Sequence, residues 1–239
     1  MKLKTTTLAA LAALAMAGAA SAVTTISYTY QTISDITSTS WVIPAGATPV
    51  TAVNFGSGGT TTWATVDWTN GNDLPNTAGT IDVDFTSTTR YDGYYIDTAG
   101  TNADNILWEG KYAGDAGSSS LDLSGFTVGQ EYLVQFVLAD TRGVGGGVEG
   151  RTITIDGTSA NIASQDSSAY TFAYASGNFA VVTARFTPAA GDTVFSFDPL
   201  VNGGSAGVQL NALNIMTIPE PSAALLGGLG MLCLLRRRR

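Results

Sequence analysis

Carboxylates are the side chains that could do chemistry in this chain, because it contains nineteen Asp and Glu residues and no histidine. Six acidic residues gather in the middle of the chain: Asp82, Asp84, Asp92, Asp97, Asp104 and Glu109. A glycosidase needs two carboxylates that face each other across a cleft, so a carbohydrate-active enzyme, a glycosidase or lyase, is one hypothesis. None of the six has motif-level spacing, and outward-facing Asp also keeps a strand surface hydrated. We therefore predict that they are structural and that the protein is not an enzyme.

The missing histidine also excludes a Ser-His-Asp triad and histidine-ligated metals. The single cysteine, Cys233, lies in an apolar run at the C-terminus, so the rest of the chain has no disulfide and no cysteine-based metal site. An all-oxygen calcium site remains, with ligands such as Asp97 and Asp104. The surrounding loops do not match the regular calcium-loop pattern. We keep a structural calcium as an alternative and expect no other cofactor.

Aromatic residues give the argument for sugar binding, because a flat ring can stack on the apolar face of a pyranose while polar side chains take its hydroxyls. The candidate glycan contacts are Trp63, Trp68, Trp108, Tyr94 and Arg142. The competing interpretation is that the three tryptophans belong to the core or rim of a β-domain, where aromatic residues are common. For Arg142, the competing interpretation is a hairpin in which Asp140 forms an ion pair with one of two arginines, Arg142 or Arg151, at the end of a sheet. We favour this interpretation over a ligand clamp.

The elements that must position these residues are short strands separated by turn residues. In residues 80–85, TIDVDF, apolar and acidic residues alternate, which predicts a strand with one wet face. Residues 131–140, EYLVQFVLAD, are apolar almost throughout, which predicts a central strand covered on both faces. Residues 151–157, RTITIDG, predict a strand that ends in an Asp156-Gly157 turn. In residues 207–215, GVQLNALNI, the apolar phase shifts, which predicts a bulge near Asn211.

About a dozen such strands in one run favour a single all-β domain over residues 23–217. Three stretches rich in Gly, Asn and Ser, at residues 69–79, 113–120 and 142–150, are predicted loops. Loops at the end of a sandwich are where binding usually occurs.

The N-terminus has the features of a secretory signal peptide over residues 1–22. Lys2 and Lys4 precede an apolar run, and Ala20-Ser21-Ala22 is a small-x-small cleavage pattern. Between residues 23 and 221 the chain keeps five basic residues against all nineteen acidic ones, a formal net charge of −14. Such an acidic domain repels phosphate backbones, so we expect no nucleic-acid partner.

The C-terminus, residues 218–239, has three parts in order: Pro219-Glu220-Pro221, an apolar run over residues 223–235, and four arginines. This arrangement resembles a PEP-CTERM sorting signal. Thirteen apolar residues give about 20 Å of helix against a hydrocarbon core of about 30 Å, which suits a temporary transmembrane helix. The resemblance implies transient anchoring in the inner membrane and processing near Pro219, Glu220 and Pro221 by an exosortase, an integral-membrane transpeptidase.

The same resemblance implies a protein of the cell surface, outer membrane or extracellular matrix of a Gram-negative bacterium that makes exopolysaccharide and biofilm. The body of the chain, through LDLSGFTVGQEYLVQFVLADTR and the closing LNALNI, is similar to galactose-binding-like jelly-roll domains. That similarity implies a jelly-roll-like antiparallel β-sandwich with a sugar-binding role. The function we expect is therefore an exported, exosortase-sorted surface or matrix protein that binds polysaccharide.

Overall fold

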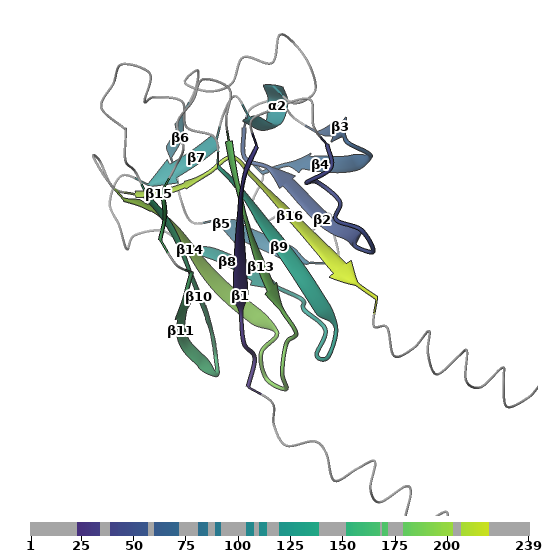
Figure 1. The fold of residues 1–239 in the computed structure, drawn as a ribbon, viewed down its shortest axis with the longest axis vertical. Coiled ribbons are helices and arrows are strands. Elements are labelled where there is room, and N and C mark those ends of the chain that lie inside the picture. Colours follow the sequence, from purple (N-terminus) through teal and green to yellow (C-terminus); the bar gives the residue numbers. More distant parts are fainter. Residues whose placement is uncertain are drawn as a thin grey trace, which may run out of the picture.

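The computed structural model describes most of the predicted domain. It covers residues 23–33, 39–56, 60–71, 81–85, 89–91, 104–107, 110–113, 120–138, 152–167, 169–171, 179–202 and 207–219. The predicted signal peptide, most of the sorting segment and large parts of the three predicted loops lie outside these residues. The described part forms two β-sheets packed face to face, with one helical turn, α2 (Asp104–Leu107) (Figure 1).

One sheet has seven strands. In spatial order they are β1 (Ser27–Ile33), β13 (Phe179–Phe186), β9 (Glu131–Leu138), β16 (Ala212–Ile218), β2 (Thr48–Asn54), β4 (Val66–Asn70) and β3 (Thr61–Trp63). All its pairs are antiparallel except β2 with β4, which run parallel.

The other sheet has nine strands. Its main path is β11 (Ile162–Asp166), β10 (Thr152–Ser159), β14 (Val194–Asn202), β15 (Gly207–Leu210), β7 (Gly110–Ala113) and β6 (Thr89–Tyr91). Three strands lie off this path: β8 (Leu121–Ser124) on β14, β5 (Asp82–Phe85) on β8, and β12 (Tyr170–Thr171) on β10. The chain changes sheets between β4 and β5, β8 and β9, β9 and β10, β12 and β13, β13 and β14, and β15 and β16. This repeated crossing confirms the predicted all-β, jelly-roll-like sandwich.

The inner faces of the two sheets enclose the main hydrophobic core. Aromatic rings from both sheets meet there; Phe186 and Phe195 have ring centroids 4.4 Å apart, and Phe136 and Phe197 are 5.2 Å apart. In β5, Val83 and Phe85 are buried while Asp82 and Asp84 are exposed, as the alternation predicted. Burial of this apolar surface is the main force that holds the sheets together.

β9 is buried on both faces, which confirms the prediction for a central strand. Phe136 belongs to the core between the sheets, whereas Val137 belongs to a second cluster on the outer face of the seven-stranded sheet. The cover over that face, which we call the cap, consists of residues 39–44, the β3–β4 hairpin and α2. Within the cap, Trp41, Val42, Trp68 and Leu107 are almost fully buried.

Asn211 marks a change of sheet, so the bulge predicted there is wrong. Leu210 pairs with Lys111 in the nine-stranded sheet, and Ala212 pairs with Asn54 in the seven-stranded sheet. Asn211 between them is fully buried; its backbone N–H donates to the Val137 carbonyl at 2.9 Å, and its side chain donates to the Leu107 carbonyl at 3.2 Å. The apolar phase shifts here because the chain passes from one sheet to the other.

Asp156 and Gly157 lie inside β10, so the predicted turn at this pair is also wrong. A Cβ atom on Gly157 would lie 2.6 Å from Ile26 Cδ1 and 2.9 Å from Phe197 Cε1. Glycine leaves room here for the side chains of Ile26, Tyr28 and Phe197, which pack against the strand backbone. The hairpin turn follows two residues later, between Ser159 and Ile162, which pair with each other.

Candidate functional site

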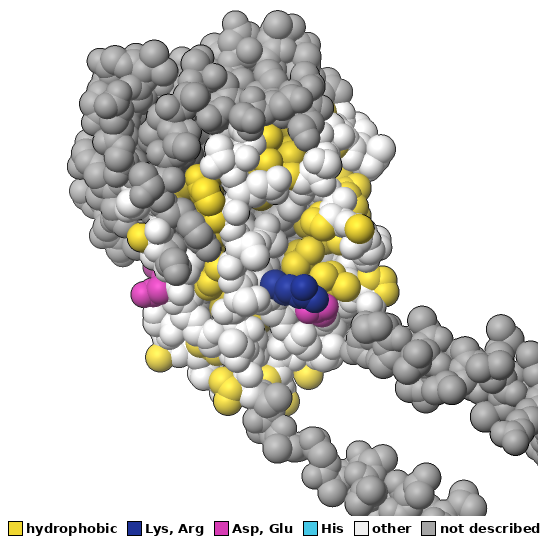
Figure 2. Space-filling view, viewed as in Figure 1, with side chains coloured by type: hydrophobic (Ala, Val, Ile, Leu, Met, Phe, Trp, Pro, Cys, Tyr) yellow, Lys and Arg dark blue, Asp and Glu magenta, His cyan; other side chains and the backbone are white. Residues whose placement is uncertain are grey.

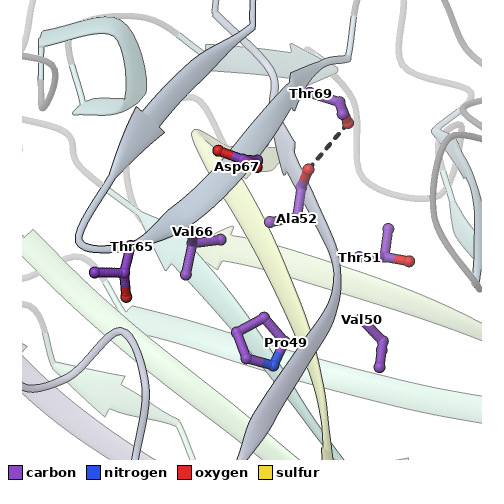
Figure 3. Close-up of a pocket in the computed structure, with 8 residues that line it drawn as sticks. All are labelled: Pro49, Val50, Thr51, Ala52, Thr65, Val66, Asp67 and Thr69. Carbon is purple, nitrogen blue, oxygen red and sulfur yellow. Dashed lines mark hydrogen bonds between the residues drawn. The ribbon is translucent and has the colours of Figure 1, made fainter.

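The best candidate for a binding site is a pocket of about 380 Å³ between β2 and the β3–β4 hairpin (Figure 3). β4 pairs with β2 at only two positions, Val53 with Thr69 and Asn54 with Asn70, and the pocket lies beside the earlier part of β2. Its lining residues are Pro49, Val50, Thr51, Ala52, Thr65, Val66, Asp67 and Thr69. The volume falls in the range of small-molecule sites.

The polar side chains of this pocket are held by hydrogen bonds to neighbouring groups. Thr69 Oγ1 donates to the Ala52 carbonyl at 3.0 Å, which ties β4 to β2 (Figure 3). Asp67 is exposed, and its Oδ1 accepts a hydrogen bond of 2.6 Å from Thr62 Oγ1. A carboxylate can accept about four hydrogen bonds, so Asp67 can still bind hydroxyl donors from a ligand.

A strained turn forms one wall of the pocket. Ala64 and Thr65 have φ values of 53° and 65°, and they connect Trp63 to Val66, which are paired across the hairpin. Two successive residues with positive φ form the type I′ hairpin turn, which favours Asn-Gly. A β-branched residue such as Thr65 is a backbone outlier in this conformation. Such strain is concentrated at functional sites, so the Ala-Thr turn supports the pocket as a candidate site.

Two of the predicted glycan-contact tryptophans lie beside this pocket, in the cap. Trp63 is half-buried, and its ring centroid lies 5.5 Å from that of Trp41 and 6.4 Å from that of Trp68. Trp68 is 0% exposed, and its Nε1 donates to the Trp63 carbonyl at 3.2 Å. A ring without exposed surface cannot stack on a sugar, so the glycan-contact interpretation is wrong for Trp68. Trp63 keeps an exposed portion, and the structure leaves its predicted role open.

Sequence reasoning did not select Trp41 or the pocket residues. Trp41 lies in residues 39–44, which show no periodic pattern, and it packs edge-on against Phe179 at 5.3 Å. The available signal was TTWATVDW, residues 61–68, in which two short β-type runs flank a two-residue turn of unusual composition.

The cap is fixed to the sheet by buried amides. Gln135 Nε2 donates to the Trp41 carbonyl at 2.6 Å. Asn214 Nδ2 donates to the Val42 carbonyl at 2.8 Å and to Gln135 Oε1 at 3.1 Å. Both amides are almost fully buried, so these bonds also satisfy polar groups that have lost water. The wall of the pocket therefore rests on a fixed support.

Of the six acidic residues considered for catalysis and predicted to be structural, the structure describes the side chains of Asp82 and Asp84, which are exposed on the outer face of the nine-stranded sheet. Asp84 is paired with Asp122, and Asp156 is paired with both Asp198 and Asp166. Ser164 Oγ donates to Asp156 Oδ1 at 2.9 Å and to Asp166 Oδ1 at 3.1 Å. Ser196 Oγ donates to Asp122 Oδ1. We call Asp84, Asp122, Asp156, Asp166 and Asp198 the acidic face.

Burial and repulsion between charges act on two carboxyls of the acidic face, those of Asp156 and Asp198. Burial, followed by the charges of Asp156 and Asp122, raises the pKa of Asp198. Burial also raises the pKa of Asp156, and the neighbouring Asp166 adds to this rise. Among the residues described, no three or more His, Cys, Asp or Glu side chains are placed to hold a metal ion.

The other predicted site residues lie outside the part of the chain that can be described. These are Trp108, Tyr94, Arg142, Asp97, Ala20, Ala22, Glu220 and Pro221, together with the side chain of Asp104. Pro219 is described and exposed, directly after β16. The calcium ligands and the signal-peptide cleavage site therefore stay predictions.

A sequence model described as the PEP-CTERM protein-sorting motif matches residues 217–239. The chain thus carries this motif at its C-terminus, and the motif implies an exported protein that an exosortase processes and sorts to the cell envelope or surface. In the described residues, no helix has the length and apolarity needed to cross a membrane. No curated protein matches the chain.

Parts of this chain match parts of three solved structures. A calcium-binding mutant of Bacteroides uniformis beta-glucuronidase 2 has 14% identity and a TM-score of 0.47, over 71% of this chain and 18% of that one. The enzymatically active domain of tailspike protein 4 from Bacteriophage CBA120 has 11% identity and a TM-score of 0.34, over 69% and 21%. TmCBM61 in complex with beta-1,4-galactotriose has 9% identity and a TM-score of 0.22, over 56% and 86%. This chain spans only about a fifth of the first two, and function must be argued from its own residues.

Proposed function

We propose that the exported domain is a non-enzymatic glycan-binding module of the cell surface or extracellular matrix, and that it binds polysaccharide in the pocket between β2 and the β3–β4 hairpin. The observation that supports this best is the combination of an exposed acceptor, Asp67, with the strained Thr65 turn and the half-buried Trp63 on one hairpin.

The chemistry of the pocket suits a neutral sugar. Threonine hydroxyls and a carboxylate exchange hydrogen bonds with sugar hydroxyls, while Pro49, Val50 and Val66 present apolar surface to the C–H faces of a ring. The exposed part of the Trp63 ring provides a stacking surface beside them. Phosphorylated or strongly anionic ligands fit less well, because Asp67 repels them.

The positions of the described carboxylates also favour binding without hydrolysis. The acidic face lies on the outer side of the nine-stranded sheet, whereas the pocket belongs to the edge of the seven-stranded sheet. Among the described residues that line the pocket, Asp67 is the one acidic side chain, and a glycosidase requires two. The alternative function is therefore a carbohydrate-active enzyme, and hydrolysis of the glycan in the test would replace this proposal.

The test is a glycan array on the purified mature protein, followed by calorimetry with the best glycan. Asp67→Ala should weaken binding about tenfold or more, since a hydrogen bond to a charged group contributes about 1.5–3 kcal/mol. Trp63→Ala should weaken it by up to about tenfold, since ring contacts contribute about 0.5–1.5 kcal/mol. Asp84→Ala, an exposed aspartate of the other sheet, is the matched control and should bind like the unmodified protein. Melting curves confirm that each variant is folded.

Three results would count against the proposal. Failure of the array to detect any glycan would remove the function, leaving a structural matrix protein. Equal loss of binding in Asp84→Ala would remove the assigned site. Release of shorter sugars from the bound glycan would show an enzyme.

A further inference from the structure

The sorting motif begins without a spacer at the end of a paired strand. β16 lies inside the seven-stranded sheet, between β9 and β2, and it ends at Ile218. Thr217 is still paired with Tyr132 on one side and Thr48 on the other, and Ile218 is paired with Glu131. Pro219 follows at once, and proline has no N–H with which to continue a strand. The first residue of the Pro-Glu-Pro sequence is thus the first residue outside the sheet.

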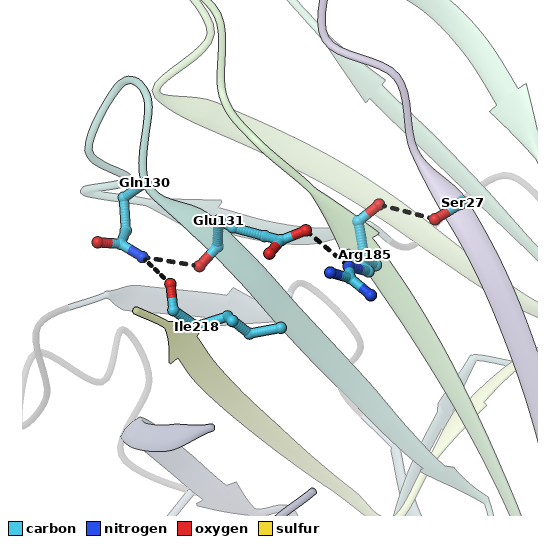
Figure 4. A network of polar contacts seen from close by, with 5 residues as sticks. All are labelled: Ser27, Gln130, Glu131, Arg185 and Ile218. Atoms are coloured by element: carbon cyan, nitrogen blue, oxygen red, sulfur yellow. Dashed lines mark hydrogen bonds and ion pairs between the residues drawn. The ribbon is translucent and has the colours of Figure 1, made fainter. Parts of the chain in front are cut away.

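A side chain holds this exit point. Gln130, in the turn before β9, donates from Nε2 to the Ile218 carbonyl at 2.8 Å and to the Glu131 carbonyl at 3.0 Å (Figure 4). One amide group therefore joins the last residue of β16 to the first residue of β9. The backbone N–H of Gln130 donates to the Thr127 carbonyl at 3.2 Å, which fixes the turn that carries Gln130.

Both ends of the domain leave from the same end of the sandwich, which we call the exit end (Figure 1). Ser27 of β1 is paired with Arg185, Arg185 with Leu133, and Leu133 with Met216, so the start of β1 and the end of β16 lie at one level. Thr24, two residues after the predicted signal cleavage, is 1% exposed, and its hydroxyl donates to Asp192 Oδ2 at 2.7 Å. The chain is fixed to the fold close to both processing points.

The exit end must also face the membrane while the sorting signal is attached. The apolar run begins at Ala223, four residues after Pro219, and four extended residues span at most about 14 Å. The residues that a membrane-embedded transpeptidase must enclose therefore lie in a narrow interval between a folded sheet and the bilayer. Residues upstream of Pro219 cannot enter its cleft while they are paired in the sheet.

We propose that the folded sheet limits access of the exosortase to the sorting motif, and that Gln130 is a positioning residue that sets this limit. Processing is fastest when the end of β16, Thr217 and Ile218, opens from β9. The hydrogen bond from Gln130 to Ile218 opposes that opening. The substrate thus regulates its own rate of release through one side chain at the exit end.

The test follows processing of the full-length chain by pulse labelling in a cell that contains the exosortase. Insertion of Gly-Ser-Gly-Ser between Ile218 and Pro219 should speed processing severalfold, because the enzyme can then enclose the motif without opening the sheet. Gln130→Met keeps the side-chain length but removes the donor. It should speed processing about fivefold, the change in an opening equilibrium that loss of one hydrogen bond of about 1 kcal/mol produces.

Two further variants separate positioning from general destabilisation. Gln130→Met should have no additional effect in the chain that carries the insertion, because the spacer removes the need for opening. Arg185→Met is the matched control: Arg185 is 55% exposed and pairs with Glu131 at 2.6 Å without touching Ile218, so processing should keep its normal rate (Figure 4). Hydrogen exchange should show faster exchange at Ile218 in Gln130→Met alone.

The inference is wrong if the insertion leaves the processing rate unchanged or slows it. It is also wrong if Gln130→Met acts as strongly in the chain with the insertion as without it, or if Arg185→Met speeds processing equally. Since none of these measurements uses a glycan, failure here is independent of the proposed sugar binding.

Discussion

Part of the outer face of the seven-stranded sheet is buried under Trp41, Val42, Trp68 and α2, whereas the outer face of the nine-stranded sheet carries the five aspartates of the acidic face. In the view onto the seven-stranded sheet, hydrophobic side chains are visible among uncharged polar ones, and charged side chains are sparse on the described part of this face (Figure 2). The two sheets share one inner core but differ in what lies beyond it.

This difference shows how one fold can separate stability from solubility. The central strand β9 of the seven-stranded sheet is apolar on both faces and needs a cap to remove its outer face from water. Strands of the nine-stranded sheet alternate, as in β10, and their acidic outer face keeps the domain hydrated. The candidate pocket lies at the margin of the cap, where an apolar layer meets exposed polar groups.

The largest expected difference between the two faces comes from Trp68→Ala. Trp68 is fully buried in the cap, so its removal should lower the free energy of unfolding by about 3–5 kcal/mol. Asp84→Ala on the other sheet should change it by less than about 0.5 kcal/mol, because its side chain is exposed. Urea unfolding of both variants measures this contrast. Similar values for the two would show that the cap does not stabilise the domain.

Asn214→Ala tests the polar attachment of the cap. The change removes the donor to the Val42 carbonyl and to Gln135 Oε1, both in a buried layer. Unsatisfied buried acceptors cost about 1–3 kcal/mol, and we expect a loss of unfolding free energy in that range. Ser164→Ala removes an exposed hydroxyl that bonds Asp156 and Asp166, so it should have a much smaller effect in the same urea titration. If Asn214→Ala left the free energy of unfolding unchanged, packing alone would hold the cap.

Sequence patterns predicted the elements whose exposure follows a local rule. Asp82 and Asp84 alternate with buried residues because one face of β5 is wet, and β9 is continuously apolar because both its faces are covered. Gly157 was misread because its role is to leave room for the side chains of Ile26 and Tyr28, a contact between segments more than a hundred residues apart. Asn211 gave a detectable phase shift, but only the topology shows that the chain changes sheets there.

The candidate site was less predictable for the same physical reason. Trp68 is buried because residues 39–44 and α2 fold over it, and neither contact is local in the sequence. The pocket exists because β4 pairs in parallel with the end of β2 and leaves the earlier part of β2 beside the hairpin. Parallel pairing of two distant strands leaves no periodic signal in either one.

The turn at the margin of the cap offers a smaller, stabilising change. Replacing Ala64 by Asn and Thr65 by Gly supplies the residues that a type I′ turn prefers, and it should raise the free energy of unfolding by about 1 kcal/mol. Because Thr65 lines the pocket, the same change should weaken glycan binding. Thermal melting and calorimetry measure the two effects. A more stable variant with undiminished binding would indicate that the strain does not serve the pocket.

The smallest expected effect comes from Asp198→Asn on the acidic face. Burial and the charges of Asp156 and Asp122 raise the pKa of Asp198 above 3.8, so the folded state holds this proton more tightly than the unfolded chain. The contribution of Asp198 to the free energy of unfolding is therefore greatest below pH 3.8 and is lost as the pH rises through the raised pKa. Removing the charge should stabilise the protein at pH 7 by up to about 1 kcal/mol, the scale of a like-charge cross-strand pair.

The pKa of Asp192 is shifted in the opposite direction to that of Asp198. Burial opposes its charge, but hydrogen bonds from Thr24, Ser159 and Asn161 prevail and lower its pKa. Its stabilisation is present above pH 3.8 and is lost as the pH falls through the lowered pKa, so Asp192→Asn should destabilise the protein at pH 7. Urea unfolding at pH 7 and pH 5 compares the two variants. If Asp198→Asn were destabilising at both pH values, hydrogen bonding would outweigh repulsion on the acidic face, and that face would stabilise the fold.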